Sequence, residues 1–231
     1  MKGVAHREVT RLRGGAPSAP AEDEVVAEEP LEIRVAGETL AVTMRTPGAD
    51  RELAVGFLFA EGVIGSRDDV GRVAHCGRRS VGDVIERCRP RAVQPGMLGA
   101  QTIAAAVESL RALQPNFART GGIHAAALCD AKGKVLVAYE DIGRHNAIDK
   151  AVGALLIAGR IPGSEAVLLV VSGRASFEVV QKAAAAGLQM VASVSAASSL
   201  AIDLAKASGI TLCGFVRNGS MTVYSHPARI A

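Results

Sequence analysis

The feature that most constrains the fold is a regular alternation of short apolar runs and helix-length segments in the last third of the chain. Apolar runs occupy residues 166–171, 188–194 and 210–216, and amphipathic segments at 177–186 and 198–207 lie between them. Short uninterrupted apolar runs are typical of strands buried on both faces, and helices that connect such strands form parallel βαβ crossovers. The pattern therefore predicts an α/β layered sheet with βαβ crossovers.

The N-terminal half predicts smaller elements. Two alternating runs at 31–35 and 39–44 flank a turn at Gly37, which is a hairpin pattern. Asp50 is a suitable capping residue for a helix over 51–60. Further along the chain, the patterns predict a helix over 97–113, a second hairpin from the runs 123–129 and 134–139, and a helix over 146–158.

These elements suggest three parts. Residues 1–24 are rich in Gly, Pro, Ala and charged side chains, which is typical of a flexible leader. We expect a smaller N-terminal portion with a hairpin and helices over 25–115, and the α/β domain over 116–231.

Composition excludes several classes of protein. The formal charge of +3 is too small a bias to indicate nucleic-acid binding, so any anion site must be local. The four cysteines are scattered without the dense pairing of a secreted disulfide scaffold, which favours a reducing compartment. The apolar runs are far shorter than the roughly 20 residues that cross a bilayer, so we expect no membrane helix.

Polar loops follow three of the expected strands, at residues 140–150, 172–178 and 195–199. In open α/β sheets, ligands bind at the carboxyl ends of the strands, where helix N-termini present free N–H groups. Arg144 and Arg174 can each bind phosphate with two hydrogen bonds, and the hydroxyl of Ser172 can donate a third. The loops therefore predict a cradle for a phosphorylated ligand, although Ser and Asn in such loops also serve as ordinary helix caps.

A fourth polar segment lies past the last crossover strand and could frame a purine. Its residues are Phe215, Val216, Arg217, Asn218, Gly219 and Ser220. The alternatives are that Phe215 belongs to the core and that Arg217 is a solvated turn residue.

His145 and Cys76 are the candidates for chemistry. His145 lies within a dense group of ionisable residues at 140–150, where it could act as a general acid or base. The alternative is a structural histidine that caps a helix or is satisfied by partners in the core. Cys76 is followed closely by Arg78 and Arg79, and cationic neighbours lower the pKa of a thiol, as a nucleophile or persulfide carrier requires. Cys88 also has cationic neighbours and is a weaker candidate. Cys129 and Cys213 lie in apolar runs and are expected in the core.

Several blocks together resemble one protein family. They are Glu28-Glu29-Pro30-Leu31, Thr43-Met44-Arg45-Thr46-Pro47-Gly48, Thr120-Gly121-Gly122-Ile123-His124-Ala125-Ala126, residues 140–150, Ser172-Gly173-Arg174-Ala175-Ser176 and Thr211-Leu212-Cys213-Gly214-Phe215. They resemble FdhD, the formate dehydrogenase accessory sulfurtransferases, from about residue 26 to the C-terminus. The block over residues 141–150 is the most specific of them.

The resemblance implies a cytoplasmic maturation factor rather than a dehydrogenase. Family members are thought to receive sulfur from a cysteine desulfurase and to pass it to the metal of bis-molybdopterin guanine dinucleotide before this cofactor enters formate dehydrogenase. The resemblance also implies a cytidine-deaminase-like fold, a homodimer, and an α/β domain that binds the cofactor. Cys76 would stand in the sulfur-carrying loop, and the cofactor would contact Arg144, His145, Ser172, Arg174 and residues 215–220.

This chain departs from the family at the sulfur-carrying loop. Members have Cys-x-x-Cys-Gly there, whereas Ala74 and His75 precede Cys76 and the first cysteine has no counterpart. A stretch that members place before this point is also missing, so the loop is either truncated in the chain or incomplete in the sequence. A cofactor chaperone without sulfur transfer is therefore an alternative function. A deaminase-type zinc hydrolase would need His-x-Glu followed by Cys-x-x-Cys. The candidate His124-Ala125-Ala126 lacks the Glu, and the sequence contains no Cys-x-x-Cys.

Overall fold

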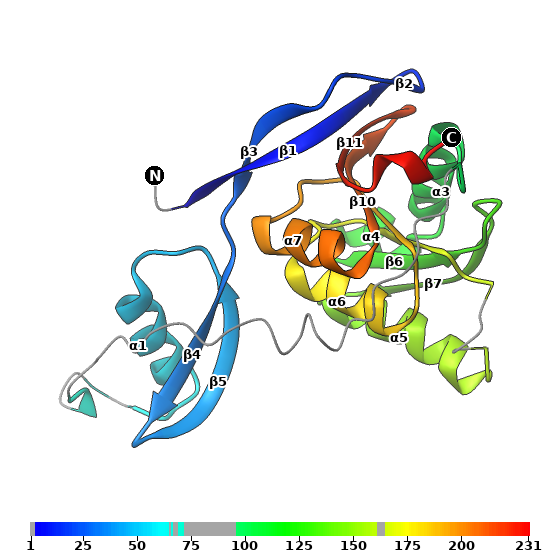
Figure 1. The fold of residues 1–231 in the computed structure, drawn as a ribbon. Coiled ribbons are helices and arrows are strands. Elements are labelled where there is room, and N and C mark those ends of the chain that lie inside the picture. Colours follow the sequence, from blue (N-terminus) through cyan, green and yellow to red (C-terminus); the bar gives the residue numbers. More distant parts are fainter. Residues whose placement is uncertain (1–2, 65, 67–68, 72–95, 161–164) are drawn as a thin grey trace.

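A computed structural model describes residues 3–64, 66, 69–71, 96–160 and 165–231, and its centre is a nine-stranded mixed sheet (Figure 1). The main path through the sheet runs β2-β1-β11-β10-β9-β8-β6-β7, and β3 pairs with β1. The strands are β1 (Val4–Arg13), β2 (Ala16–Pro17), β3 (Ala21–Val26), β6 (His124–Cys129), β7 (Val135–Asp141), β8 (Leu168–Val171), β9 (Met190–Ser193), β10 (Thr211–Arg217) and β11 (Ser220–Ser225).

The predicted crossovers are confirmed. β8, β9 and β10 are parallel neighbours, connected by α6 (Phe177–Ala185) and α7 (Ser199–Ser208). β6 is antiparallel to both β7 and β8, so β7 runs in the same direction as the three parallel strands. The carboxyl ends of β7, β8, β9 and β10 therefore lie at one edge of the sheet.

Helices cover both faces of the sheet, which explains why its central strands are continuously apolar. In β8, Leu169 and Val171 pack into the core layer under α5 (Arg144–Ile157), α6 and α7. Leu168 and Val170 point to the opposite face, into the layer under α3 (Ala100–Ala112). The short helix α4 (Pro115–Thr120) follows α3 and leads into β6.

A second, smaller group of elements confirms the expected N-terminal hairpin and helix. β4 (Glu29–Val35) and β5 (Glu38–Arg45) form a separate two-stranded sheet, followed by α1 (Asp50–Ala60). Figure 1 shows this group beside the large sheet, reached through the connection between β3 and β4. None of the described helices has the length and apolar character that crossing a membrane requires.

The expectation of a flexible leader over residues 1–24 is wrong. β1 pairs with β11, with Thr10 opposite Val223, and two of its side chains, Val9 and Leu12, are buried in the two core layers. Gly14 and Gly15 have positive φ angles and make the tight turn into β2. β1 pairs with the far end of the chain, and the sequence around residues 1–24 carries no signal of a partner so distant. The Gly- and Pro-rich composition alone therefore suggested a flexible segment. β1 is thus a strand of the large sheet and α3 packs against one face of it, although both precede the expected domain start at residue 116.

Candidate functional site

The loops at the common edge of the sheet form one continuous rim, as predicted. Gly173, in the loop after β8, accepts a hydrogen bond from Ser193 Oγ at 2.6 Å, and Ser195 O in the next loop accepts one from the Phe215 backbone N–H at 3.1 Å. A side chain on Gly173 would meet His124 Nδ1 at 3.5 Å and Arg144 Cδ at 3.7 Å. The rim therefore extends from Arg144 to Phe215.

Two cavities flank this rim, of about 700 Å³ and about 190 Å³. The loop after β8 lines both, through Ser172 in the larger cavity and Arg174 in the smaller. The loop after β9 does the same through Val194 and Ser198. A ligand lying across the strand ends would therefore have access to both cavities.

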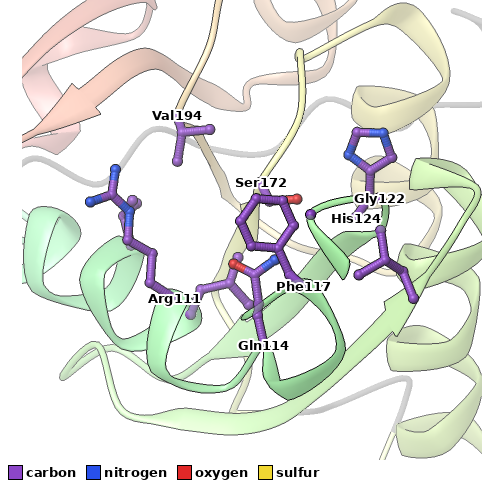
Figure 2. A pocket seen from close by; sticks show the side chains of 11 residues that line it. Arg111, Gln114, Phe117, Gly122, His124, Ser172 and Val194 are labelled. Carbon is purple, nitrogen blue, oxygen red and sulfur yellow. The ribbon is translucent and has the colours of Figure 1, made fainter. Parts of the chain in front are cut away.

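The larger cavity has a mostly apolar lining with a few polar groups. Figure 2 shows the side chains of Arg111, Gln114 and Phe117 around the cavity, together with Ser172 and Val194 from the loops at the strand ends. Apolar walls with a few polar groups are typical of sites for small organic ligands.

The position of α4 at this cavity is fixed by Glu140 at the end of β7. Its two carboxylate oxygens accept hydrogen bonds from the backbone N–H groups of Asn116 and Phe117 at 3.0 and 2.8 Å. Glu140 therefore has a structural role at the first turn of α4.

The smaller cavity carries positive charge. It lies between the rim and the β4–β5 hairpin and is lined by Arg45, Arg144 and Arg174. Arg45 is neutralised by Glu29 at 3.0 Å and Asp50 at 2.8 Å. Within the described residues, neither Arg144 nor Arg174 has a carboxylate partner, and the enclosed Nε of Arg144 has no hydrogen-bond partner. Two arginines thus remain available for an anionic ligand.

The ionisable residues around Arg144 form a structural network instead of competing for that arginine. Asp141 contacts Lys150 Nζ at 2.5 Å and accepts hydrogen bonds from the Gly143 backbone N–H at 2.8 Å and Asn146 Nδ2 at 3.0 Å. These contacts, with Lys150 first, lower the pKa of Asp141 to about 2. Asp141 is therefore ionised at neutral pH and fixes the start of α5, from which Arg144 projects.

His145 links two helices and lines neither cavity. Its Nδ1 lies 2.8 Å from a carboxylate oxygen of Glu178, and its Nε2 lies 3.2 Å from Ser176 Oγ. Burial lowers the pKa of His145, and the charge of Glu178 only partly opposes this effect. These contacts favour a structural role for His145 over a role as a general acid or base.

The expected purine frame at 215–220 is only partly at the rim. Phe215 is exposed and has a positive φ of 52°, so it is not a core residue. The Val216 side chain is 1% exposed in the core under α3, so only its backbone is available to a ligand at the rim. Arg217 and Ser220 close the β10–β11 hairpin around Asn218 and Gly219.

The tip of this hairpin packs against α3. A Cβ atom on Gly219 would lie 2.6 Å from Gln101 Nε2, so a larger residue would displace this side chain, and the φ of 73° itself favours glycine. Arg217 and Asn218 are exposed at this tip. They are therefore accessible to a ligand that extends beyond Phe215.

Cys76, the expected sulfur carrier, lies outside the described residues, as does Cys88. Cys129 and Cys213 are fully buried in the sheet, as predicted. Burial raises the pKa of each of these thiols to about 12, and the nearby Asp130 adds to the effect at Cys129. Neither is a thiolate at neutral pH.

We therefore expect iodoacetamide at pH 8 to leave Cys129 and Cys213 unmodified in the folded protein, because alkylation requires the thiolate. Peptide mapping by mass spectrometry measures the modification of each cysteine. The same treatment in denaturant is the control and should label all four. Rapid labelling of Cys129 or Cys213 in the folded state would contradict their assignment to the core.

Sequence reasoning missed three residues at the site. His124 was considered as part of an incomplete zinc motif and of a family block, but not as a site residue, yet it lines the larger cavity beside Gly173. Glu28 and Arg45 line the smaller cavity, although they come from the N-terminal portion. Their only sequence signal was their place in the blocks Glu28-Glu29-Pro30-Leu31 and Thr43-Met44-Arg45. Nothing local indicates that these blocks reach the strand ends.

The fold and the site together define an α/β protein with a positively charged rim at the carboxyl ends of its strands. The family model described as FdhD/NarQ family matches residues 26–94 and 74–231. The chain belongs to this family.

The relatives are similar over nearly the whole chain. A sulfur carrier protein FdhD from Anaeromyxobacter dehalogenans (strain 2CP-C) is 47% identical, with 98% of this chain and 93% of the relative covered. One from Mycolicibacterium paratuberculosis is 42% identical, with both chains fully covered. The crystal structure of a candidate formate dehydrogenase accessory protein from Desulfotalea psychrophila gives a TM-score of 0.56 at 25% identity, over 99% of this chain and all of the other.

The comparisons also bear on the departure at the cysteine loop. The alignment with the Mycolicibacterium relative spans 274 positions, whereas this chain has 231 residues. The two matches to the family model overlap at residues 74–94. An alignment that splits in this way is expected where a chain lacks a stretch that its relatives have, and the overlap includes Cys76.

Proposed function

We propose that this protein is a sulfur carrier that matures the molybdenum cofactor of formate dehydrogenase. In this proposal it accepts sulfur from a cysteine desulfurase in the cytoplasm and delivers it to bis-molybdopterin guanine dinucleotide. Membership of a family whose relatives are named sulfur carrier proteins supports the sulfur chemistry. The observation that carries the ligand assignment is the rim itself, where Arg144 and Arg174 have no carboxylate partner among the described residues.

The rim suits a ligand that is large and carries phosphates. Guanidinium groups bind phosphate oxygens strongly, and helix N-termini at strand ends favour negative charge. The apolar lining of the larger cavity suits flat, weakly polar rings. We assign the diphosphate groups of the cofactor to the side of Arg144 and Arg174, and a ring system to the side of Phe117 and His124.

Cys76 is the proposed carrier. The cofactor is the cargo, and the persulfide on the carrier thiol supplies the sulfur. Buried thiols with a pKa near 12 cannot attack a persulfide donor, which excludes Cys129 and Cys213 from this role. Two arginines close to Cys76 in the sequence favour its thiolate form.

We expect incubation with a cysteine desulfurase and cysteine to add the mass of one sulfur atom to the peptide that contains Cys76. Intact-mass and peptide mass spectrometry measure the adduct, and the Cys76→Ser variant should show none. Cys88→Ser is the matched control, and it should keep the adduct. A persulfide found only on Cys88, Cys129 or Cys213 would contradict the assignment.

The alternative is a chaperone that binds the cofactor without transferring sulfur, and the missing first cysteine of the family motif favours it. Activation of formate dehydrogenase in cells that lack their own accessory protein separates the two functions. A carrier requires Cys76, so Cys76→Ser should abolish activation. A chaperone does not require it, and full activation by that variant would favour the alternative.

We also propose that the protein acts as a homodimer. Sedimentation velocity measures its oligomeric state directly, and a single species of 23.8 kDa at micromolar concentration would contradict the dimer.

A further inference from the structure

The connection between β3 and β4 crosses the rim and places Glu28 at the smaller cavity. Val26, at the end of β3, pairs with Ser198 in a parallel bridge. Glu28 Oε2 accepts a hydrogen bond from the Phe177 backbone N–H at 2.9 Å and one from Ser198 Oγ at 2.5 Å. Its own backbone N–H donates to Ser199 Oγ at 3.0 Å.

Glu28 therefore supplies the N-terminal cap that α6 does not provide for itself. The N-cap residue Ser176 makes no side-chain capping hydrogen bond, and its hydroxyl contacts His145 instead. Ser198 is the N-cap residue of α7, and its hydroxyl accepts a hydrogen bond from the Ala201 backbone N–H while it donates to Glu28. A single carboxylate thus sits at the N-termini of two helices, where negative charge is favoured.

The same carboxylate lies in a cavity whose cations it does not neutralise. Glu28, Arg144 and Arg174 all line this cavity, yet the Glu28 carboxylate accepts its hydrogen bonds from the neutral donors Phe177 N–H and Ser198 Oγ. The Nε group of Arg144 is enclosed and has no hydrogen-bond partner. The cavity thus combines three features of a phosphate site: helix N-termini, two cations that have no acidic partner in the part of the chain that the structure describes, and an oxygen anion already in place.

We infer that the smaller cavity binds a phosphate or diphosphate group, and that Glu28 is an internal anion that this group displaces. The inference rests on the proposed function, because it assigns the diphosphate of that ligand to this cavity. A phosphate oxygen would take the hydrogen bonds of Phe177 N–H and Ser198 Oγ, and Arg144 and Arg174 would pair with the remaining oxygens. Glu28 thus competes with the ligand and sets its affinity.

Displacement of Glu28 would also affect the β4–β5 hairpin. Glu29, the next residue, pairs with Arg45 on β5, and Arg45 in turn pairs with Asp50 at the start of α1. Met44 and Thr46 line the same cavity. Entry of a phosphate group would therefore release residues 26–28 from the rim. These ion pairs would transmit the displacement to the hairpin.

Inorganic pyrophosphate tests the inference, because it carries neither guanine nor sulfur. Glu28→Gln keeps an oxygen acceptor for Phe177 N–H and removes the competing charge. We expect this variant to bind pyrophosphate about tenfold more tightly than the unmodified protein in isothermal titration calorimetry, because a like charge in the site opposes binding. Hydrogen exchange should also show faster exchange at residues 26–28 when pyrophosphate is added to the unmodified protein.

Glu24→Gln is the matched control, since it removes the same charge from an exposed position on β3 and should leave the affinity unchanged. If Glu28→Gln does not fold, Glu28→Asp serves as the second variant. Its side chain is shorter but keeps the charge, so its affinity for pyrophosphate should lie between that of the unmodified protein and the tenfold gain expected for Glu28→Gln. Equal or weaker binding by the folded Glu28 variants would overturn the inference, as would the absence of pyrophosphate binding to all of them. Tighter binding by Glu28→Gln without any binding of guanosine diphosphate would support the phosphate site and contradict the proposed ligand.

Discussion

Replacing Arg229 with methionine is expected to lower the free energy of unfolding by about 3 to 5 kcal/mol. Arg229 is fully buried in the short helix η2 (Pro227–Arg229) near the C-terminus. Its Nη1 donates to Gln189 O at 2.7 Å, Gly209 O at 2.8 Å and Thr211 Oγ1 at 3.1 Å. Methionine fills much of the volume but leaves these buried acceptors without their donor.

The arginine also supports the segment that leads into α3. The Met97 backbone N–H donates to Arg229 O at 2.7 Å, and Leu98 forms a parallel bridge with Ile230. Urea denaturation monitored by circular dichroism measures the loss of stability. Arg13→Met is the matched control because Arg13 is exposed on β1, and it should change stability by less than about 0.5 kcal/mol. A loss below about 1 kcal/mol in Arg229→Met would contradict the structural role.

The second large effect concerns the rim. Arg174→Ala is expected to weaken the binding of guanosine diphosphate by about 1.5 to 3 kcal/mol, which corresponds to a charge-assisted hydrogen bond to phosphate. Arg174 is exposed in the loop between β8 and α6, so its removal should leave the fold intact. Arg217→Ala should have an effect of the same size if the guanine end of the ligand reaches the tip of the β10–β11 hairpin.

Arg160→Ala is the control for this experiment, because Arg160 follows the C-terminal end of α5, whereas Arg144 begins this helix at the rim. Calorimetry at two salt concentrations should show a weaker salt dependence for Arg174→Ala than for the unmodified protein, because one phosphate contact is lost. Unchanged affinity would remove Arg174 from the site. A loss equal to that of Arg160→Ala would indicate a general charge effect.

Much of the fold was predictable because its signals are local. The apolar runs at 166–171, 188–194 and 210–216 predicted β8, β9 and β10, since strands covered by helices on both faces carry little polar alternation. The hairpin turn at Gly37 was equally clear, because positive φ angles there favour glycine. β1 was missed because its partner, β11, lies at the other end of the chain.

The candidate site was also predictable only in part. Arg144, Ser172 and Arg174 were predicted at one edge because parallel strands end together, and the rim confirms this arrangement. His145 and Val216 were placed there by position in the sequence, yet the contacts of His145 with Glu178 and the burial of Val216 turn both side chains away from the cavities.

By itself, the sequence determined the α/β architecture, the edge of the sheet where the polar loops meet and the family of the protein, because these depend on periodicity and short motifs. Only the tertiary structure decided which charges remain available there. Asp141 and Lys150 neutralise each other, Arg45 is held by Glu29, and Glu28 reaches the helix N-termini from a distant part of the chain. Pairing of charges depends on distances across the fold, and the order of residues along the chain does not contain them.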